Sequence, residues 1–220
     1  MNRPAALDCS LYLVTDPDIA GERSLLDIVG RALRGGVSLV QLRDKTAEAR
    51  DLLEQARALK ALLDPHGVPL VVNDRVDVAA AAGVGCHIGQ TDLPAAAARA
   101  ILGEDAILGL SIDRAEHARA ADPADLDYVA HGPFAATATK ADAGQAVGCE
   151  GLSAVRRLTA LPLVAIGGID AANAGAAIHA GADGVAAVAA IIGASDPEAA
   201  ARALRHVVDH ARREKTGAWQ

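Results

Sequence analysis

Aromatic side chains are nearly absent from this sequence: Phe, Trp and Tyr make up 2% of its 220 residues, whereas 51% are hydrophobic. A core must therefore consist of Ala, Val, Leu and Ile, which suits strands packed in layers against helices. The sequence also lacks the run of about 20 apolar residues that spans a bilayer. Its first residues, MNRPAALDCS, lack the apolar segment of a secretory signal. We expect a cytoplasmic globular protein without a membrane partner.

Positive charge is also in short supply, because 21 Lys and Arg residues face 28 Asp and Glu residues, giving a formal net charge of -7. This balance disfavours a nucleic-acid partner, since neutralising phosphates takes a surplus of Lys and Arg over a whole face. Any phosphate site must be built from local donors. Cysteine is scarce too: Cys9, Cys86 and Cys149 lie far apart without CxxC spacing. This indicates reduced thiols rather than a metal centre or a disulfide.

Short apolar runs bounded by polar residues recur along the chain, as β-strands require. Between them lie Ala- and Leu-rich stretches, such as 24–34 and 47–63, whose apolar residues are spaced three and four apart as in amphipathic helices. Several stretches end at glycine, for example Gly35, Gly83 and Gly181, where the left-handed residue that closes a helix costs least. The eight strand-like runs are 11–16, 37–44, 69–74, 85–89, 106–112, 128–133, 163–168 and 184–191.

Strands that alternate with helices predict a parallel sheet, and eight such units predict closure into a (β/α)8 TIM barrel, an α/β fold. No linker interrupts the repeat, so we expect residues 1–220 to form a single domain with a frayed C-terminal tail from about Arg212. A doubly wound open sheet is the alternative. It is disfavoured because Thr15-Asp16-Pro17, and not a GxGxxG turn, follows the first strand.

In a barrel the loops after the strands form the active face, so polar residues at strand ends matter most. Alternation along the second strand points Gln41 and Arg43 to one side, and Lys45 continues at the rim. Three nitrogen-bearing groups could thus converge on an anion. The alternative interpretation is surface charge at the start of the next helix.

Two carboxylates, Asp74 and Asp92, end or follow the neighbouring third and fourth strands. Such a pair suits Mg²⁺, which keeps several waters and shares phosphate oxygens. Each carboxylate could instead cap a helix, since Asp is favoured at the N-cap, and Pro94 follows shortly after Asp92.

The later loops contain candidate phosphate donors. Residues 137–140 after the sixth strand supply hydroxyls and an ammonium in an Ala- and Gly-rich stretch. After the seventh strand, Gly167-Gly168 would let backbone N–H groups approach a phosphate, and Asn173 follows near a helix start. A tight turn into that helix is the alternative.

Histidine and serine provide no obvious nucleophile. His87 lies within the fourth strand, where a hydrogen-bonded core histidine is more common than a catalytic base. Ser111 ends the fifth strand and could act as a hydroxyl ligand. No GxSxG elbow accompanies it.

Seven segments, each at a predicted strand end, together resemble the thiamine phosphate synthase family over nearly the whole chain. They are YLVTD (12–16), QLRDK (41–45), NDR (73–75), HIGQTD (87–92), GLS (109–111), TATK (137–140) and AIGGI (165–169). The resemblance implies a transferase of thiamine biosynthesis with Mg²⁺ as cofactor. Such an enzyme joins 4-amino-2-methyl-5-hydroxymethylpyrimidine diphosphate to a thiazole ethyl phosphate, releasing pyrophosphate and forming thiamine phosphate. Loss of pyrophosphate would leave a pyrimidine-methyl cation that the thiazole nitrogen captures, so no nucleophilic side chain is needed.

The resemblance also implies roles for individual residues. The catalytic groups it implies are Arg43, Lys45, Ser111 and Lys140. The residues it implies for the pyrimidine diphosphate are Gln41, Arg43, Lys45, Asn73, Ser111 and Lys140. The metal ligands it implies are Asp74 and Asp92. The residues it implies for the thiazole phosphate are Thr137, Thr139, Gly168, Val188 and Ala189.

Three departures from the family pattern cluster near the thiazole phosphate side. Ala135 and Ala136 stand where an aromatic residue and a proline are usual, Ala189 replaces a serine, and Asp113 replaces a histidine. The alternatives are therefore a thiazole tautomerase-like enzyme, or a non-catalytic regulatory barrel that binds thiazole phosphate. An oligomer of identical chains is a further open expectation.

Overall fold

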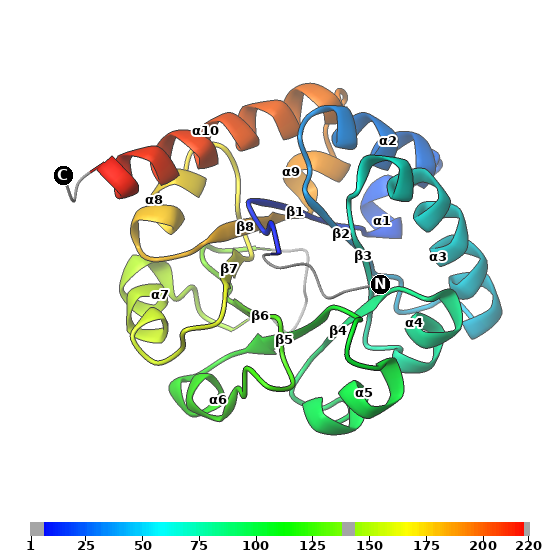
Figure 1. The fold of residues 1–220 in the computed structure, drawn as a ribbon. Coiled ribbons are helices and arrows are strands. Elements are labelled where there is room, and N and C mark those ends of the chain that lie inside the picture. The colour runs from blue at the N-terminus through cyan, green and yellow to red at the C-terminus, as the bar shows by residue number, and fades with distance from the viewer. Residues whose placement is uncertain (1–6, 138–143, 218–220) are drawn as a thin grey trace.

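Eight parallel strands close into a barrel in chain order, and β1 pairs with both β2 and β8 (Figure 1). Leu13 of β1 lies opposite Val40 on one side and Ala187 on the other, which confirms the predicted barrel and excludes the open sheet. The computed structural model describes residues 7–137 and 144–217. The strands are β1 (Leu11–Val14), β2 (Leu39–Leu42), β3 (Leu70–Asn73), β4 (Gly85–Ile88), β5 (Leu108–Ile112), β6 (Tyr128–His131), β7 (Leu163–Ile166) and β8 (Gly184–Ala187).

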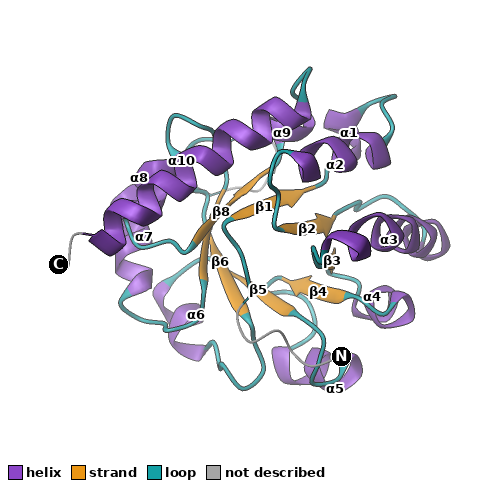
Figure 2. Ribbon diagram, turned by 45° about the horizontal axis from the view of Figure 1, so that its top comes forward, coloured by secondary structure: helices purple, strands orange, loops and turns teal. Residues whose placement is uncertain are grey.

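Helices surround the barrel on its outside (Figure 2). Some of them have conventional end signals: the Ser24 hydroxyl accepts from Asp27 N at the start of α2, and Gly83 closes α4 in the left-handed region. The helices within the described ranges are α1 (Pro17–Ala20), α2 (Leu25–Arg34), α3 (Ala49–Leu63), the 3₁₀ turn η1 (Asp64–His66), α4 (Val76–Ala82), α5 (Ala95–Leu102), α6 (Ala115–Ala120), α7 (Gly148–Arg156), α8 (Ala174–His179), α9 (Ala189–Ile192) and α10 (Pro197–Gly217). No helix in residues 7–137 and 144–217 is long and apolar enough to cross a membrane.

The apolar side chains form two clusters, as the alternation of strand side chains requires. The larger cluster fills the layer between the strands and the helices. The smaller one fills the barrel interior and contains Tyr12 and Tyr128, both fully buried. Gly109 makes room for one of them, because a Cβ at this position would lie 2.1 Å from Cζ of Tyr128. The barrel interior therefore holds two phenol rings in a chain with few aromatic residues.

Two expected boundaries near the C-terminus are wrong. The eighth strand ends at Ala187 rather than at Ile191, and residues Ala189–Ile192 form the helical turn α9. The guanidinium of Arg23 binds the carbonyl oxygens of Ile192 and Ala194 at the end of this turn, which satisfies groups that a strand would not present. The tail is not frayed from Arg212, because α10 stays helical to Gly217.

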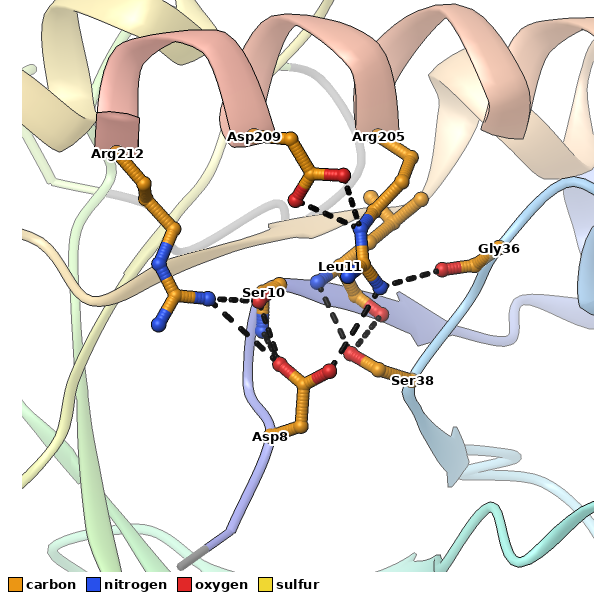
Figure 3. A network of polar contacts seen from close by, with 8 residues as sticks. All are labelled: Asp8, Ser10, Leu11, Gly36, Ser38, Arg205, Asp209 and Arg212. Atoms are coloured by element: carbon orange, nitrogen blue, oxygen red, sulfur yellow. Dashed lines mark hydrogen bonds and ion pairs between the residues drawn. The ribbon is translucent and has the colours of Figure 1, made fainter. Parts of the chain in front are cut away.

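A polar network holds α10 across the start of β1 (Figure 3). Arg205 and Arg212 point from the helix to Asp8, with Nη1–Oδ distances of 3.6 and 3.7 Å. Asp8 also accepts hydrogen bonds from the backbone N and the hydroxyl of Ser10, at 2.9 and 2.5 Å. Arg212 in turn donates to the Ser10 hydroxyl, and Arg205 pairs with Asp209. The C-terminal helix is thus tied to the first strand by charge as well as by its apolar face.

We expect Asp8→Asn to lower the melting temperature by about 2–4 °C at pH 7, since partly exposed ion pairs contribute up to about 1 kcal/mol. Partial burial acts to raise the pKa of Asp8, but the Ser10 hydrogen bonds and both guanidiniums lower it overall. A lowered folded pKa gives stability that is present above the unfolded pKa, about 3.9, and is lost as the pH falls through the folded pKa. Calorimetry from pH 7 to pH 3 should therefore show the two melting temperatures converging in acid.

The matched control is Asp209→Asn, which removes only an ion pair within α10. We expect it to cost less than Asp8→Asn at pH 7. Equal losses for the two variants would contradict the assignment of Asp8 as the link between α10 and β1.

Candidate active site

The carboxyl ends of all eight strands meet at one rim of the barrel, and most of the predicted site residues lie there. Asn73 is the last residue of β3, and Asp74 follows it directly. Ser111 is the penultimate residue of β5, and Gly168 follows β7 by two positions. Thr139 and Lys140 lie outside the described residues.

Asp74 and Asp92 form a carboxylate pair at this rim. Partial burial, followed by the hydrogen bond and the charge of Asp92, raises the pKa of Asp74, while Lys45 and Asn73 act in the opposite direction. Asp74 has a φ of +62° and is the sole non-glycine residue with positive φ in the described ranges. Such backbone strain is typical of functional positions. Asp92 is held by Gly89, whose N–H donates to Oδ2 at 2.7 Å.

Neither carboxylate caps a helix. The N-cap of α4 is Arg75 and that of α5 is Pro94, and neither has a side-chain capping bond. The alternative interpretation of the two carboxylates as helix caps is therefore wrong.

The pair fits a metal that needs few protein ligands. No group of three or more His, Cys, Asp and Glu side chains suited to a metal exists in residues 7–137 and 144–217. A Zn²⁺ site with three or four protein ligands has no support there. Two neighbouring carboxylates would instead suit Mg²⁺, which takes few protein ligands and completes its shell with water and phosphate oxygens.

The basic residues after β2 have separate partners. Arg43 Nη1 lies 3.2 Å from Oδ2 of Asp16, and Lys45 Nζ lies 3.9 Å from Oδ2 of Asp74. Gln41 is buried and turns into the barrel, where its Nε2 donates to the Tyr12 hydroxyl at 2.5 Å. The structure thus places Lys45 at the carboxylate pair and Gln41 beneath the rim.

Asp16 was missed as a partner of Arg43 in the sequence analysis. Its Oδ1 accepts from Asp18 N and Ile19 N at 3.1 and 3.2 Å, so it caps α1 as well. The Asp16-Pro17 dipeptide could have predicted the helix cap, because an N-cap residue followed by Pro at the first helical position is a common helix start. It does not indicate the contact with Arg43.

His87 is a hydrogen-bonded core histidine, as the sequence predicted. Its Nδ1 lies 2.8 Å from the Tyr128 hydroxyl, and its Nε2 lies 2.9 Å from Oγ of Ser111. Burial lowers the pKa of His87 to about 4, although the charge of Asp92 acts to raise it. The ring is therefore neutral at pH 7.

The loops after β6 and β7 lie against each other. Gly167 and Gly168 have φ values of +91° and +66°, and a Cβ on Gly168 would lie 2.7 Å from the carbonyl oxygens of Ala135 and Ala136. Asn173 fixes the turn, since its Nδ2 donates to Gly168 O at 2.7 Å. Only glycine fits this approach, so the two loops form one backbone-lined edge of the rim.

The loops after β6 and β8 contain further predicted residues. Thr137 is half-buried at the end of the first described range. Val188 packs partly against the interior cluster, and Ala189 is exposed at the start of α9.

Comparison with known proteins gives consistent matches. A family model described as thiamine monophosphate synthase matches residues 11–191. A thiamine-phosphate synthase from Azorhizobium caulinodans is 53% identical over 211 residues, 96% of this chain and 100% of that protein. One from Xanthobacter autotrophicus is 55% identical over 210 residues, 95% of this chain and 100% of that protein. The solved thiamine phosphate pyrophosphorylase from Pyrococcus furiosus has a TM-score of 0.84 and 32% identity, and covers 93% of this chain and 98% of that chain.

We expect Asp74→Asn to raise the melting temperature of the metal-free protein by a few degrees at pH 7. A carboxyl with a raised folded pKa destabilises the folded state once the pH exceeds that pKa, and the uncharged amide removes this cost. Asn also tolerates a positive φ better than most residues. Thermal unfolding in EDTA measures the change.

Asp44→Asn is the control for Asp74→Asn. The Asp44 carboxylate accepts from Thr46 N, the Thr46 hydroxyl and Ala47 N, each at 2.9 Å. We expect that variant to be less stable than the unmodified chain. A loss of stability in Asp74→Asn as well would contradict the carboxylate repulsion.

Proposed function

Because the chain belongs to the thiamine monophosphate synthase family, we propose that the rim of its barrel binds a pyrimidine diphosphate and a thiazole phosphate side by side. The chain is a transferase that forms thiamine phosphate. The reaction joins 4-amino-2-methyl-5-hydroxymethylpyrimidine diphosphate to the thiazole ethyl phosphate and releases pyrophosphate. The names of both bacterial relatives favour this reaction over that of a thiazole tautomerase-like enzyme or a non-catalytic barrel.

The observation that carries the site assignment is the carboxylate pair. In our proposal Asp74 and Asp92 hold Mg²⁺, which when bound would neutralise charge on the diphosphate oxygens. Asn73, which hydrogen-bonds Asp74, helps to orient that carboxylate. Lys45, already 3.9 Å from Asp74, supplies a positive charge on the same side. The diphosphate thus meets both a cation site and an ammonium group.

The remaining groups of the first substrate's site come from three strand ends. Arg43 is held in place by Asp16 and would contact diphosphate oxygens. Gln41 and Ser111 face the pyrimidine end of the substrate in this proposal. Lys140 is assigned to the diphosphate from the family resemblance alone.

The second substrate would lie against the loops after β6, β7 and β8. Backbone N–H groups in the turn at Gly168 would suit a phosphate, as N–H groups at the start of a helix after a glycine-rich turn do. The hydroxyls of Thr137 and Thr139 would add donors. Val188 and Ala189 complete this side with an apolar contact and a backbone donor.

The chemistry we propose is a dissociative substitution. The bond between the methylene carbon and the diphosphate oxygen breaks, and its electron pair leaves with pyrophosphate. The lone pair of the thiazole nitrogen then forms the new carbon–nitrogen bond. Lys45, Arg43 and Lys140 stabilise the charge that builds on the leaving group, and Ser111 orients the pyrimidine.

The described residues fit a route without a protein nucleophile. Burial raises the pKa values of Cys9 and Cys86 to about 12, with smaller contributions from nearby carboxylates, so both thiols stay protonated at neutral pH. Both nitrogens of His87 are engaged by hydroxyl groups. Charge stabilisation and orientation are therefore the means of catalysis that these residues offer.

We expect the purified chain with Mg²⁺ and both substrates to release pyrophosphate and form thiamine phosphate. Asp74→Asn and Asp92→Asn should each lower kcat/KM by about a hundredfold or more, since metal stabilisation of the leaving group contributes several kcal/mol. A coupled pyrophosphate assay with chromatographic detection of thiamine phosphate measures both products.

Asp64→Asn is the matched control, because this exposed carboxylate lies after α3, away from the rim, and pairs with Lys60. We expect its activity to stay within about twofold of the unmodified chain, as is usual for surface changes. Turnover that persists in EDTA, or in both rim variants, would overturn the metal assignment.

A further inference from the structure

Five polar side chains form a continuous hydrogen-bonded chain through the barrel interior. Gln41 Nε2 lies 2.5 Å from the Tyr12 hydroxyl, which lies 2.8 Å from the Tyr128 hydroxyl. The Tyr128 hydroxyl lies 2.8 Å from Nδ1 of His87, whose Nε2 lies 2.9 Å from Oγ of Ser111. The five residues come from β2, β1, β6, β4 and β5 in that order. These hydrogen bonds thus connect two predicted substrate contacts, Gln41 and Ser111, through three residues to which no role has been assigned.

The three middle side chains are fixed by their packing. Tyr12 and Tyr128 are fully buried and meet edge to face, with ring centroids 5.8 Å apart at 84°. His87 lies against the second ring at a centroid distance of 5.5 Å. Gly109 leaves the space that the Tyr128 ring occupies. These rings cannot turn to other partners, so each hydroxyl keeps the neighbours described above.

The Gln41 amide sets the direction of the hydrogen bonds at one end. Nε2 can only donate, so the Tyr12 oxygen accepts and its own proton goes to Tyr128. The Tyr128 oxygen accepts that proton and donates its own to Nδ1 of His87. Each hydroxyl has a single proton, so neither step can be reversed independently.

The His87 ring passes this direction on to Ser111. In residues 7–137 and 144–217 its two nitrogens contact only hydroxyl oxygens, and a ring whose Nδ1 accepts a hydrogen bond cannot be an imidazolium, because an imidazolium has no acceptor nitrogen. A neutral ring has one N–H, and because Nδ1 accepts from Tyr128, that N–H is at Nε2. Ser111 Oγ therefore accepts from His87, and its own proton stays available to another acceptor.

One end of this hydrogen-bonded series therefore offers a donor and the other end offers an acceptor. Ser111, which is half-buried, offers a donor. Gln41 has committed Nε2 to Tyr12, which leaves Oε1 as an acceptor. No hydrogen bond between described residues uses Oε1, so this oxygen is the group that Gln41 offers at its end of the series.

We propose that Tyr12, Tyr128 and His87 are positioning residues that fix Gln41 as an acceptor and Ser111 as a donor toward the pyrimidine ring. This inference rests on the proposed function of the site. An aminopyrimidine offers an amine N–H and a ring nitrogen lone pair, which complement that acceptor and that donor. A ring with an oxo group in place of the amine offers a carbonyl and a ring N–H, the reverse pattern. The interior hydrogen bonds would thus select amino over oxo pyrimidines. Exchanging donor for acceptor at Gln41 or at Ser111 requires every hydrogen bond between these two residues to change direction.

The tautomer of His87 tests the direction of the chain without any substrate. Long-range ¹H–¹⁵N correlation of ¹⁵N-histidine-labelled protein at neutral pH distinguishes a protonated from a bare ring nitrogen. The chain has seven histidines, and the His87→Gln variant identifies the signals of His87 by their loss. We expect a protonated Nε2 and a bare Nδ1. A protonated Nδ1, or two protonated nitrogens, would overturn the inference.

Steady-state kinetics test the positioning role. Tyr128→Phe and Tyr12→Phe each remove one hydroxyl and keep the ring, so each interrupts the chain at a different bond. We expect either variant to raise KM for the pyrimidine diphosphate about tenfold, the effect of one lost hydrogen bond, with KM for the thiazole phosphate within about twofold. Unchanged KM for the pyrimidine substrate in both variants would overturn the inference, and if one variant fails to fold, the other decides.

Ser38→Ala is the control for a loss of stability alone. Its hydroxyl donates to Leu11 O at 3.2 Å and accepts from Leu11 N at 3.1 Å, at the opposite end of the β1–β2 pair. It should lower the melting temperature and leave both KM values unchanged. If the protein is inactive but Nε2 of His87 is protonated, the proposed function is refuted and the inferred direction of the hydrogen bonds stands. If the protein is active but Nδ1 of His87 is protonated, only the inference about the direction of the hydrogen bonds is refuted.

Discussion

The approach of two carboxylates, Asp74 and Asp92, is the constraint around which the rim is organised. Partial burial, followed by the hydrogen bond and the charge of Asp92, raises the pKa of Asp74, so an ionised pair of carboxylates destabilises the folded protein. The surrounding groups reduce the cost without removing it. Lys45 lies 3.9 Å from Asp74, Asn73 hydrogen-bonds it, and the Gly89 N–H holds Asp92. In our proposal, a site arranged in this way gains most stability when a cation and a phosphate bind together.

The two ends of the barrel differ in the backbone geometry of their loops. At the amino ends of the strands, charges are paired: Arg99 with Asp127 at 2.7 Å, and Asp8 with the arginines of α10. At the carboxyl ends, backbone strain at Asp74 and the glycine turn at Gly168 are retained. The rim has ion pairs too, between Arg43 and Asp16 and between Lys45 and Asp74, so the two ends differ in backbone strain rather than in charge pairing.

Local sequence predicted the repeat because each unit carries its own punctuation: glycine closes helices such as α4, and apolar alternation marks the strands. The position of Asp74 and Ser111 at one rim of the barrel could be predicted, because closure brings the carboxyl ends of all strands together. The Tyr12–Tyr128 contact could not, since it joins residues 116 positions apart across the barrel interior. The end of β8 was missed because Ala189–Ile192 continues the apolar run of the strand, whereas the hydrogen bond from Arg23 to Ile192 O joins residues far apart in the sequence.

The central claim is that the carboxylate pair exists to bind a metal-bound diphosphate. Calorimetric titration of the pyrimidine diphosphate into the unmodified chain, without the thiazole phosphate, tests this most directly, because binding is measured apart from turnover. Our account predicts that affinity falls at least about tenfold when EDTA replaces Mg²⁺, since the unscreened carboxylates would then repel the diphosphate. Equal affinity with and without Mg²⁺ would contradict it.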